Sequence, residues 1–276
     1  MSPPGVPRRV TGDGLPLFSL REINRLDPAQ KEKIYRALIP EPVFVDHGID
    51  PITCCGRDGR RGVRFVCPAG LGLVRIEIRR EPGDRDCLFF VELADTTYRQ
   101  IELSFCLIND PDAERFDIDV DEKGRDNFFG TLRRNIPEEL RAMAAGLSPN
   151  QVRRGLKMFS RFFRRLEYFV ASLGIDTIMA EPLSYNNAIR YEKYGFDYLC
   201  GKQLMLWIDR EFQPGGTLFQ RLDGSTPFRR PGMERTVRGR SWAIHDGILP
   251  MPWDGVKIYK TIGVDAGVDT FPRRTY

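Results

Sequence analysis

Hydrophobic residues between positions 60 and 125 alternate with polar ones, which is the pattern of strands with one buried face. Val74, Ile76 and Ile78 alternate with charged residues, and the same period of two continues at Ile101 and Leu103. Five strands are expected, at 63–67, 73–79, 87–94, 100–108 and 115–121. Short turns rich in Pro, Gly, Asn and Asp separate them, which predicts an antiparallel meander.

Helical periods flank this region. A helix at 28–38 is expected after Asp27, with a proline at its first position. A second begins at a capping box of Asn135 and Glu138 and stops at Gly146. A third is expected to begin at 148–151 and to carry one apolar stripe as far as Gly174. The stripe comprises Val152, Leu156, Phe159, Phe163, Leu166, Val170 and Leu173.

The remaining order of elements predicts a parallel crossover. A strand at 177–180 follows the long helix, and a helix at 185–194 and a strand-like segment at 196–209 come next. An antiparallel meander joined to strand, helix and strand predicts an α+β fold with a mixed sheet flanked by helices. We expect a flexible N-terminal arm at 1–18, a domain at 19–211, and a long C-terminal extension at 212–276 that packs on the domain or on a partner subunit.

Composition narrows the class of protein. The chain has 276 residues, 41% of them hydrophobic, which is enough for one substantial core. Its net charge of +4 is spread among interspersed acids and bases, so it does not favour a nucleic-acid partner. Without a long apolar run or a signal-peptide pattern, a soluble cytoplasmic protein with no membrane partner is expected. The six cysteines contain no C-x-x-C pair and are expected to be small core residues.

The most specific signal is the segment Tyr191-Glu-Lys-Tyr-Gly-Phe196. It has the form of a helix end, with Gly195 at the stop, where a positive φ is favourable. With the order of elements over residues 60–210, it resembles the GNAT superfamily of N-acetyltransferases, whose members share this helix end after a meander, a long helix and a parallel strand. The resemblance implies an N-acyltransferase that moves an acyl group, expected to be acetyl, from an acyl-CoA to a small-molecule or peptide amine.

The resemblance also implies catalytic roles. Tyr191 falls where many members place the tyrosine that protonates the leaving CoA thiolate, although it is equally consistent with a surface residue of an amphipathic helix. Glu181, Glu92 and Glu102 are the candidates for the base that takes the proton of the amine. The oxyanion of the tetrahedral intermediate also needs hydrogen-bond donors, which are considered with the cofactor-binding residues.

Several residues are expected to contact the cofactor. Ser184 and Asn187 precede Tyr191 on its helix, and the backbone near Val120 and Glu122 is expected to polarise the thioester carbonyl, by analogy with the family's fourth strand. The family's diphosphate loop, Arg/Gln-x-x-Gly-x-Gly/Ala, has no clean copy. The nearest segment is Arg153-Arg154-Gly155-Leu156-Lys157, with Lys157 in place of the second small residue, and it follows the expected helix N-terminus at Ser148 to Gln151.

Two interpretations of this loop stay open. In the first, the helix N-terminus and its basic residues bind the diphosphate without a second glycine. In the second, those residues are only the solvated face of the helix. An acyl carrier protein as donor, or a non-catalytic GNAT-fold scaffold that forms a homo-oligomer through the extension, are the alternative functions.

Other groups of residues are weaker signals for a functional site. Asp117, Asp119 and Asp121 lack the glycine and the glutamate that a calcium loop requires. His245 lies beside an acid but has no cysteine partner in the pattern, and is expected to be a loop residue. The segment 228–240 holds five arginines, a weak signal for an anion or RNA patch. Two histidines do not favour a structural zinc site.

Overall fold

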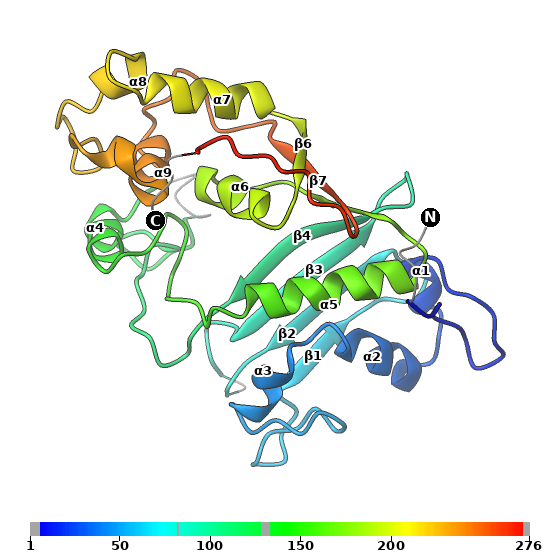
Figure 1. Ribbon diagram of the computed structural model, residues 1–276. Coiled ribbons are helices and arrows are strands. Elements are labelled where there is room, and N and C mark those ends of the chain that lie inside the picture. Colours follow the sequence, from blue (N-terminus) through cyan, green and yellow to red (C-terminus); the bar gives the residue numbers. More distant parts are fainter. Residues whose placement is uncertain (1–5, 82, 128–132, 273–276) are drawn as a thin grey trace. The chain divides into compact units, whose positions relative to one another are not determined.

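The computed structural model describes residues 6–81, 83–127 and 133–272 (Figure 1). The chain forms two compact units, which divide it differently from the expected boundaries at 18 and 211. Unit 1 comprises residues 1–112, 155–180 and 260–264; unit 2 comprises residues 113–154, 181–259 and 265–276. The first five residues of the expected N-terminal arm lie outside the described residues, while Leu17 within the arm is buried.

Unit 1 contains the predicted meander. Strands β1 (Val63–Val66), β2 (Leu73–Ile78), β3 (Phe89–Asp95) and β4 (Ile101–Ile108) pair antiparallel in chain order, and β5 (Thr177–Ala180) pairs parallel with β4. Val74, Ile76 and Ile78 are buried, as their alternation predicts. The mixed sheet and the α+β class are therefore confirmed.

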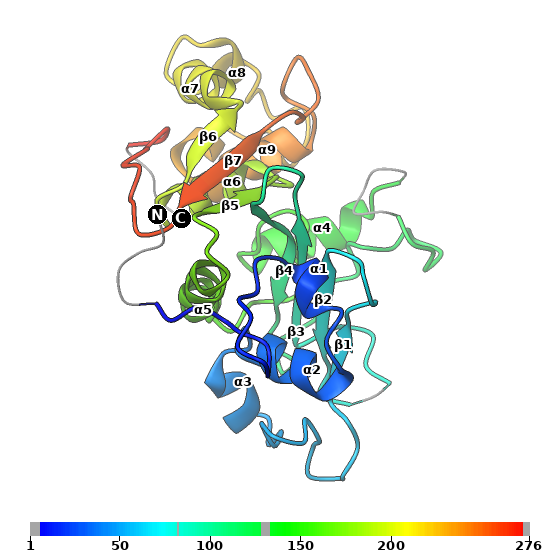
Figure 2. The ribbon, with the colours of Figure 1, turned by 90° about the vertical axis from the view of Figure 1, so that its right-hand side faces the viewer.

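Helices of unit 1 cover one face of these strands. They are α1 (Leu20–Ile23), α2 (Pro28–Arg36), α3 (Glu41–Val45) and α5 (Phe159–Ser172). Helix α5 lies across the strands in Figure 1 and to one side of them in Figure 2, with the ring of Phe162 5.7 Å from that of Phe89. Asp27 caps α2 as predicted, because its carboxylate accepts hydrogen bonds from two backbone N–H groups of the first turn.

The predicted start of the long helix at 148–151 is wrong, since α5 begins at Phe159. Asn150 and Lys157 have φ values of +65° and +57°, which no α-helix accommodates. The Gln151 side chain accepts a hydrogen bond from the Ser148 N–H and closes a local turn instead. Val152 belongs to a separate apolar cluster of unit 2, which includes Trp242, so its phase with the stripe of α5 is coincidental.

The predicted strand at 115–121 is also absent. Val120 makes only an isolated bridge with Asp126. The acids of the segment bind arginines close by in sequence, at 2.7 Å between Arg115 and Asp119 and at 2.7 Å between Arg125 and Asp121. These local ion pairs and backbone turns replace a ladder of strand hydrogen bonds.

Unit 2 consists mostly of helices. They are α4 (Ile136–Ala144), α6 (Tyr185–Glu192), α7 (Lys202–Glu211), α8 (Thr217–Gln220), the 3-10 helix η1 (Met233–Arg235) and α9 (Val237–His245). Strand β6 (Asp197–Cys200) pairs antiparallel with residues 257–259 of β7 (Lys257–Thr261), whose last two residues belong to unit 1. The long segment after 212 thus contributes a strand.

Two local predictions in unit 2 are corrected. The strand-like segment 196–209 is a strand only to Cys200, because Gly201, at φ +91°, starts helix α7, which buries Met205 and Ile208 at a helical spacing. The capping box at the start of α4 does not form. Asn135 occupies the N-cap, but its side-chain amide donates to the Asp117 carbonyl and Glu138 accepts from the Asp117 N–H.

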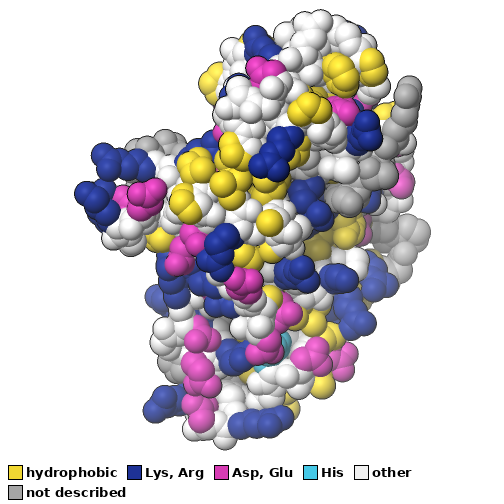
Figure 3. Space-filling view, turned by 90° about the vertical axis from the view of Figure 1, so that its left-hand side faces the viewer, with side chains coloured by type: hydrophobic (Ala, Val, Ile, Leu, Met, Phe, Trp, Pro, Cys, Tyr) yellow, Lys and Arg dark blue, Asp and Glu magenta, His cyan; other side chains and the backbone are white. Residues whose placement is uncertain are grey.

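The surface agrees with the mixed charge pattern. On the face shown in Figure 3, acidic and basic side chains are interspersed. Three of the cysteines are buried, but Cys200 is exposed, so the prediction that the cysteines are core residues is wrong for that one. None of the helices in the described ranges has both the length and the apolar character to cross a membrane.

Candidate functional site

Strands β4 and β5 of unit 1 run side by side over a short distance only. They pair parallel at Ile101–Ile178 and at Glu102–Met179, and β5 ends one residue later while β4 continues to Ile108. The register of β4 with β3 shifts between Leu103 and Phe105, so Ser104 is an extra residue, a β-bulge. Because a bulge bends its strand and interrupts pairing, β4 continues beyond Glu102 without β5 as its partner.

The segment that leads into α5 passes close to the end of β4. Gly155 forms an antiparallel bridge with Asn109. A Cβ atom on Gly155 would lie 2.9 Å from the carbonyl oxygen of Ile108, closer than real Cβ atoms approach. A glycine is therefore required at 155 by its close approach to another backbone.

Lys157 occupies the position where the GNAT loop has its second small residue, and its φ of +57° lies in the left-handed region that glycine prefers. Two residues later α5 begins, with no side chain capping its N-terminus. Lys157 and Ser160 are exposed at this end of a 14-residue helix. Uncapped N–H groups, the positive end of the helix dipole and a lysine together suit an anion.

Two of the predicted candidate bases lie in the sheet of unit 1, and they differ in their partners. Glu92 binds Arg75 at 2.7 Å. Glu102, at the last β4–β5 pair, accepts a hydrogen bond from the Ser104 hydroxyl at 3.5 Å and makes no ion pair with any described residue. Glu92 is engaged by a cation and Glu102 is not, and this difference in partners favours Glu102 as the candidate base.

Tyr191 lies near the end of α6 in unit 2. Its half-buried ring packs at 4.9 Å, tilted, against Phe196. The Ser184 hydroxyl donates to Asn186 at 2.9 Å, and the Asn187 amide oxygen accepts from Asn186 at 3.1 Å. Ser184 and Asn187 are thus joined through Asn186 at the first turn of the helix that carries Tyr191.

The third candidate base, Glu181, lies outside the sheet. It is exposed and forms an ion pair with Lys257 at 2.6 Å. Glu181 therefore resembles Glu92 rather than Glu102 in having a cation as its partner.

The remaining residues of unit 2 that were predicted to bind the cofactor interact with nearby parts of unit 2. The guanidinium groups of Arg153 and Arg154 donate to the backbone carbonyls of Ala113 and Ala145. Val120 and Glu122 lie outside any strand, so the analogy with the family's fourth strand is wrong for them. In the observed fold, the fourth strand of the meander is β4.

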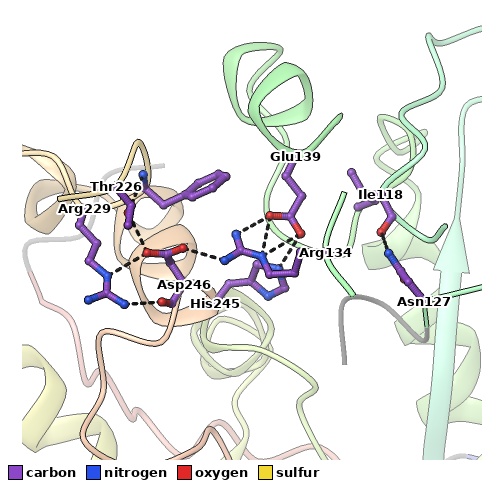
Figure 4. A network of polar contacts seen from close by, with 9 residues as sticks. Ile118, Asn127, Arg134, Glu139, Thr226, Arg229, His245 and Asp246 are labelled. Carbon is purple, nitrogen blue, oxygen red and sulfur yellow. Dashed lines mark hydrogen bonds and ion pairs between the residues drawn. The ribbon is translucent and has the colours of Figure 1, made fainter. Parts of the chain in front are cut away.

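A polar network that the sequence did not indicate lies in unit 2. Figure 4 shows Arg134 between the carboxylates of Glu139 and Asp246, at 2.9 Å and 2.7 Å. His245 Nε2 lies 3.2 Å from Glu139, and Arg229 binds Asp246 at 2.8 Å. More than 100 residues separate Arg134 from Asp246, and a single sequence carries no signal for such a pairing.

This network is a structural element with balanced charge. Burial of Glu139 opposes its ionisation, but the hydrogen bonds from His245 and Arg134 outweigh burial and hold the pKa of Glu139 below its ordinary value. Two carboxylates face two guanidinium groups, which ties α4 to the end of α9. His245 is therefore a helix-end residue bound to an acid rather than a loop residue, and Arg229 is not part of a free basic patch.

No three His, Cys, Asp or Glu side chains within the described ranges are grouped so that they would hold a metal ion. Comparisons of the chain with protein-family models, with curated proteins and with solved structures found no match.

Proposed function

We propose that this chain is an N-acyltransferase of the GNAT type that transfers an acyl group, expected to be acetyl, from an acyl-CoA to an amine. The observation that carries the proposal is the course of β4 in unit 1. This strand leaves its parallel partner at a bulge, and its end meets a glycine-dependent turn at the N-terminus of α5. The order of strands and helices around it is the one that the resemblance implies.

In this proposal the cofactor's diphosphate binds at the start of α5. The backbone N–H groups of the first turn and the Lys157 ammonium would donate to the phosphate oxygens. The left-handed backbone at Lys157 is a conformation that glycine adopts readily. The missing second glycine is therefore compatible with CoA binding.

The acyl group would lie along β4 beyond its bulge. Successive residues of a strand direct their N–H groups to opposite edges, and the Asn109 N–H donates toward β3. The Ile108 N–H, one residue earlier, thus points away from β3. We assign to this part of β4 the polarisation of the thioester carbonyl that was expected of Val120 and Glu122.

The reaction requires one base and one acid. The amine nitrogen attacks the thioester carbonyl, the carbon–sulfur bond breaks, the amine proton passes to the base, and the thiolate takes a proton from the acid. We assign the base to Glu102, because Glu181 is held by Lys257. For the acid the proposal takes Tyr191 on the resemblance alone.

Binding of the donor tests the proposal first. Acetyl-CoA, a longer acyl-CoA and CoA should each raise the midpoint of thermal unfolding, since a ligand that binds only the folded state stabilises it. A panel of amines should then stimulate the release of free CoA thiol from acetyl-CoA. If no CoA compound binds, the proposal is wrong, and acyl transfer from a carrier protein or a scaffold role takes its place.

A further inference from the structure

A pocket of about 450 Å³ lies in unit 1 among α2, α3 and α5. Its apolar lining includes Ile39, Phe44 and Ile49, whose side chains are largely buried. Pockets of this volume, with apolar walls and a few polar groups, are typical of small-molecule sites. The turn at Gly155 and the N-terminus of α5, which carry the proposed acyl-CoA site, do not line this pocket.

The charged residues of the pocket are unbalanced. Lys33, Arg36 and Arg165 line it, against one acid, the exposed Glu41. Within the described ranges none of the three cations lies in a close ion pair, although the charge of Arg36 contributes to lowering the pKa of the exposed Asp50. An apolar pocket lined by three cations and one acid attracts a negatively charged ligand.

Both arginines are held in place by the backbone. Arg36 Nη1 donates to the Ile52 carbonyl at 2.6 Å, and Arg165 Nη1 donates to the Ala37 carbonyl at 3.2 Å. Arg36 also hydrogen-bonds to the Cys54 side chain. A guanidinium group has five N–H donors, so one or two fixed hydrogen bonds orient the group and leave others for a ligand. Orientation before binding lowers the entropic cost of capturing an anion.

We propose that this pocket binds an amphipathic organic anion, a carboxylate or phosphate group on an apolar chain. The anionic group would contact Lys33, Arg36 and Arg165, and the apolar chain would cover Val45 and Pro51, the exposed apolar residues of the lining. An inorganic anion would leave the apolar lining uncovered, and an organic cation would be repelled. The proposal is independent of acyl transfer, because it uses other residues.

Isothermal titration of the full chain tests the proposal with four probes: octanoate, octyl phosphate, inorganic phosphate and octylamine. The variants are Lys33→Gln, whose exposed side chain makes the change safe for folding, and Arg165→Gln. Arg164→Gln is the matched control, an exposed arginine of the same helix that does not line the pocket. Removing one charged hydrogen bond should weaken binding about tenfold.

The proposal expects octanoate or octyl phosphate to bind wild type, with weaker binding to both variants and unchanged binding to Arg164→Gln. Whichever of the two binds more tightly identifies the anionic group. The proposal is overturned if neither binds, if the variants bind as wild type does, or if octylamine binds equally well. Inorganic phosphate that binds as tightly as octyl phosphate would overturn the role of the apolar lining.

Discussion

Substitution of Gly155 by alanine perturbs the turn on which the proposed cofactor site depends. The added Cβ would lie 2.9 Å from the Ile108 carbonyl oxygen, and because that oxygen belongs to the backbone of β4, either the strand end or the turn must move. Overpacking of this kind costs about 1–3 kcal/mol. In a chain of this size each kcal/mol lowers the Tm by about 2–4 °C, so we expect a fall of roughly 2–12 °C.

The effect on binding should exceed the effect of lost stability alone. A shift of the turn displaces the first N–H groups of α5, and we expect the Kd for acetyl-CoA to rise at least about tenfold, the loss of one charged hydrogen bond. The assays are thermal unfolding and isothermal titration of the purified variant. The titration is run at a temperature where the variant remains folded.

Gly83→Ala is the control. Gly83 also belongs to unit 1, its φ lies outside the left-handed region, and no atom outside its chain neighbours lies within 4 Å of the position of an added Cβ. This variant should keep the Tm and the acetyl-CoA affinity of wild type. The reasoning is refuted if Gly155→Ala matches Gly83→Ala in both measurements.

Three further predictions concern other residues. Lys157→Gly should be about 1 kcal/mol more stable than Lys157→Ala in chemical denaturation, because φ is +57° there; equal stability would contradict the assigned backbone. Glu139→Gln should cost about 1–3 kcal/mol near neutral pH, since it removes one of the two carboxylates that bind Arg134 and leaves Asp246 as the other. Because the pKa of Glu139 is lowered on folding, this stabilisation is complete above the unfolded pKa of about 4.3 and is lost as the pH falls through the folded pKa. The free energy of unfolding relative to wild type, with the exposed Asp13→Asn as control, should therefore differ less in acid; a difference that does not shrink as the pH falls below the unfolded pKa of about 4.3 would contradict it. Tyr191→Phe and Glu102→Gln should each lower kcat about 10²-fold or more at unchanged acetyl-CoA affinity, and a variant with the wild-type rate loses its assigned role.

Periodicity predicted the elements whose apolar residues all face one core. Strands β2, β3, β4 and β5 and the central part of α5 belong to this class. The Asp27 cap of α2 was predicted from a different signal, an acid followed by a proline at the start of a helix. In these segments the local pattern and the tertiary packing agree. Period-two or period-3.6 spacing is then sufficient evidence.

The failures have physical causes that the pattern does not contain. Val152 is in phase with the stripe of α5 but packs with Trp242, and residues 115–121 alternate like a strand while their acids bind nearby arginines. The network around Arg134 joins residues far apart in the chain. For the candidate site, the sequence indicated Gly155 and Lys157 as an imperfect loop, but the left-handed φ and the approach to Ile108 come only from the structure.

Hydrogen exchange with and without acetyl-CoA tests the central claim most directly, because it locates the cofactor on the chain. Peptides that cover β4 from Ser104 to Ile108, and the turn and first helical residues from 155 to 161, should exchange more slowly when acetyl-CoA is bound. Slowed exchange confined to other segments, or unchanged exchange at saturating acetyl-CoA, would contradict the proposed site.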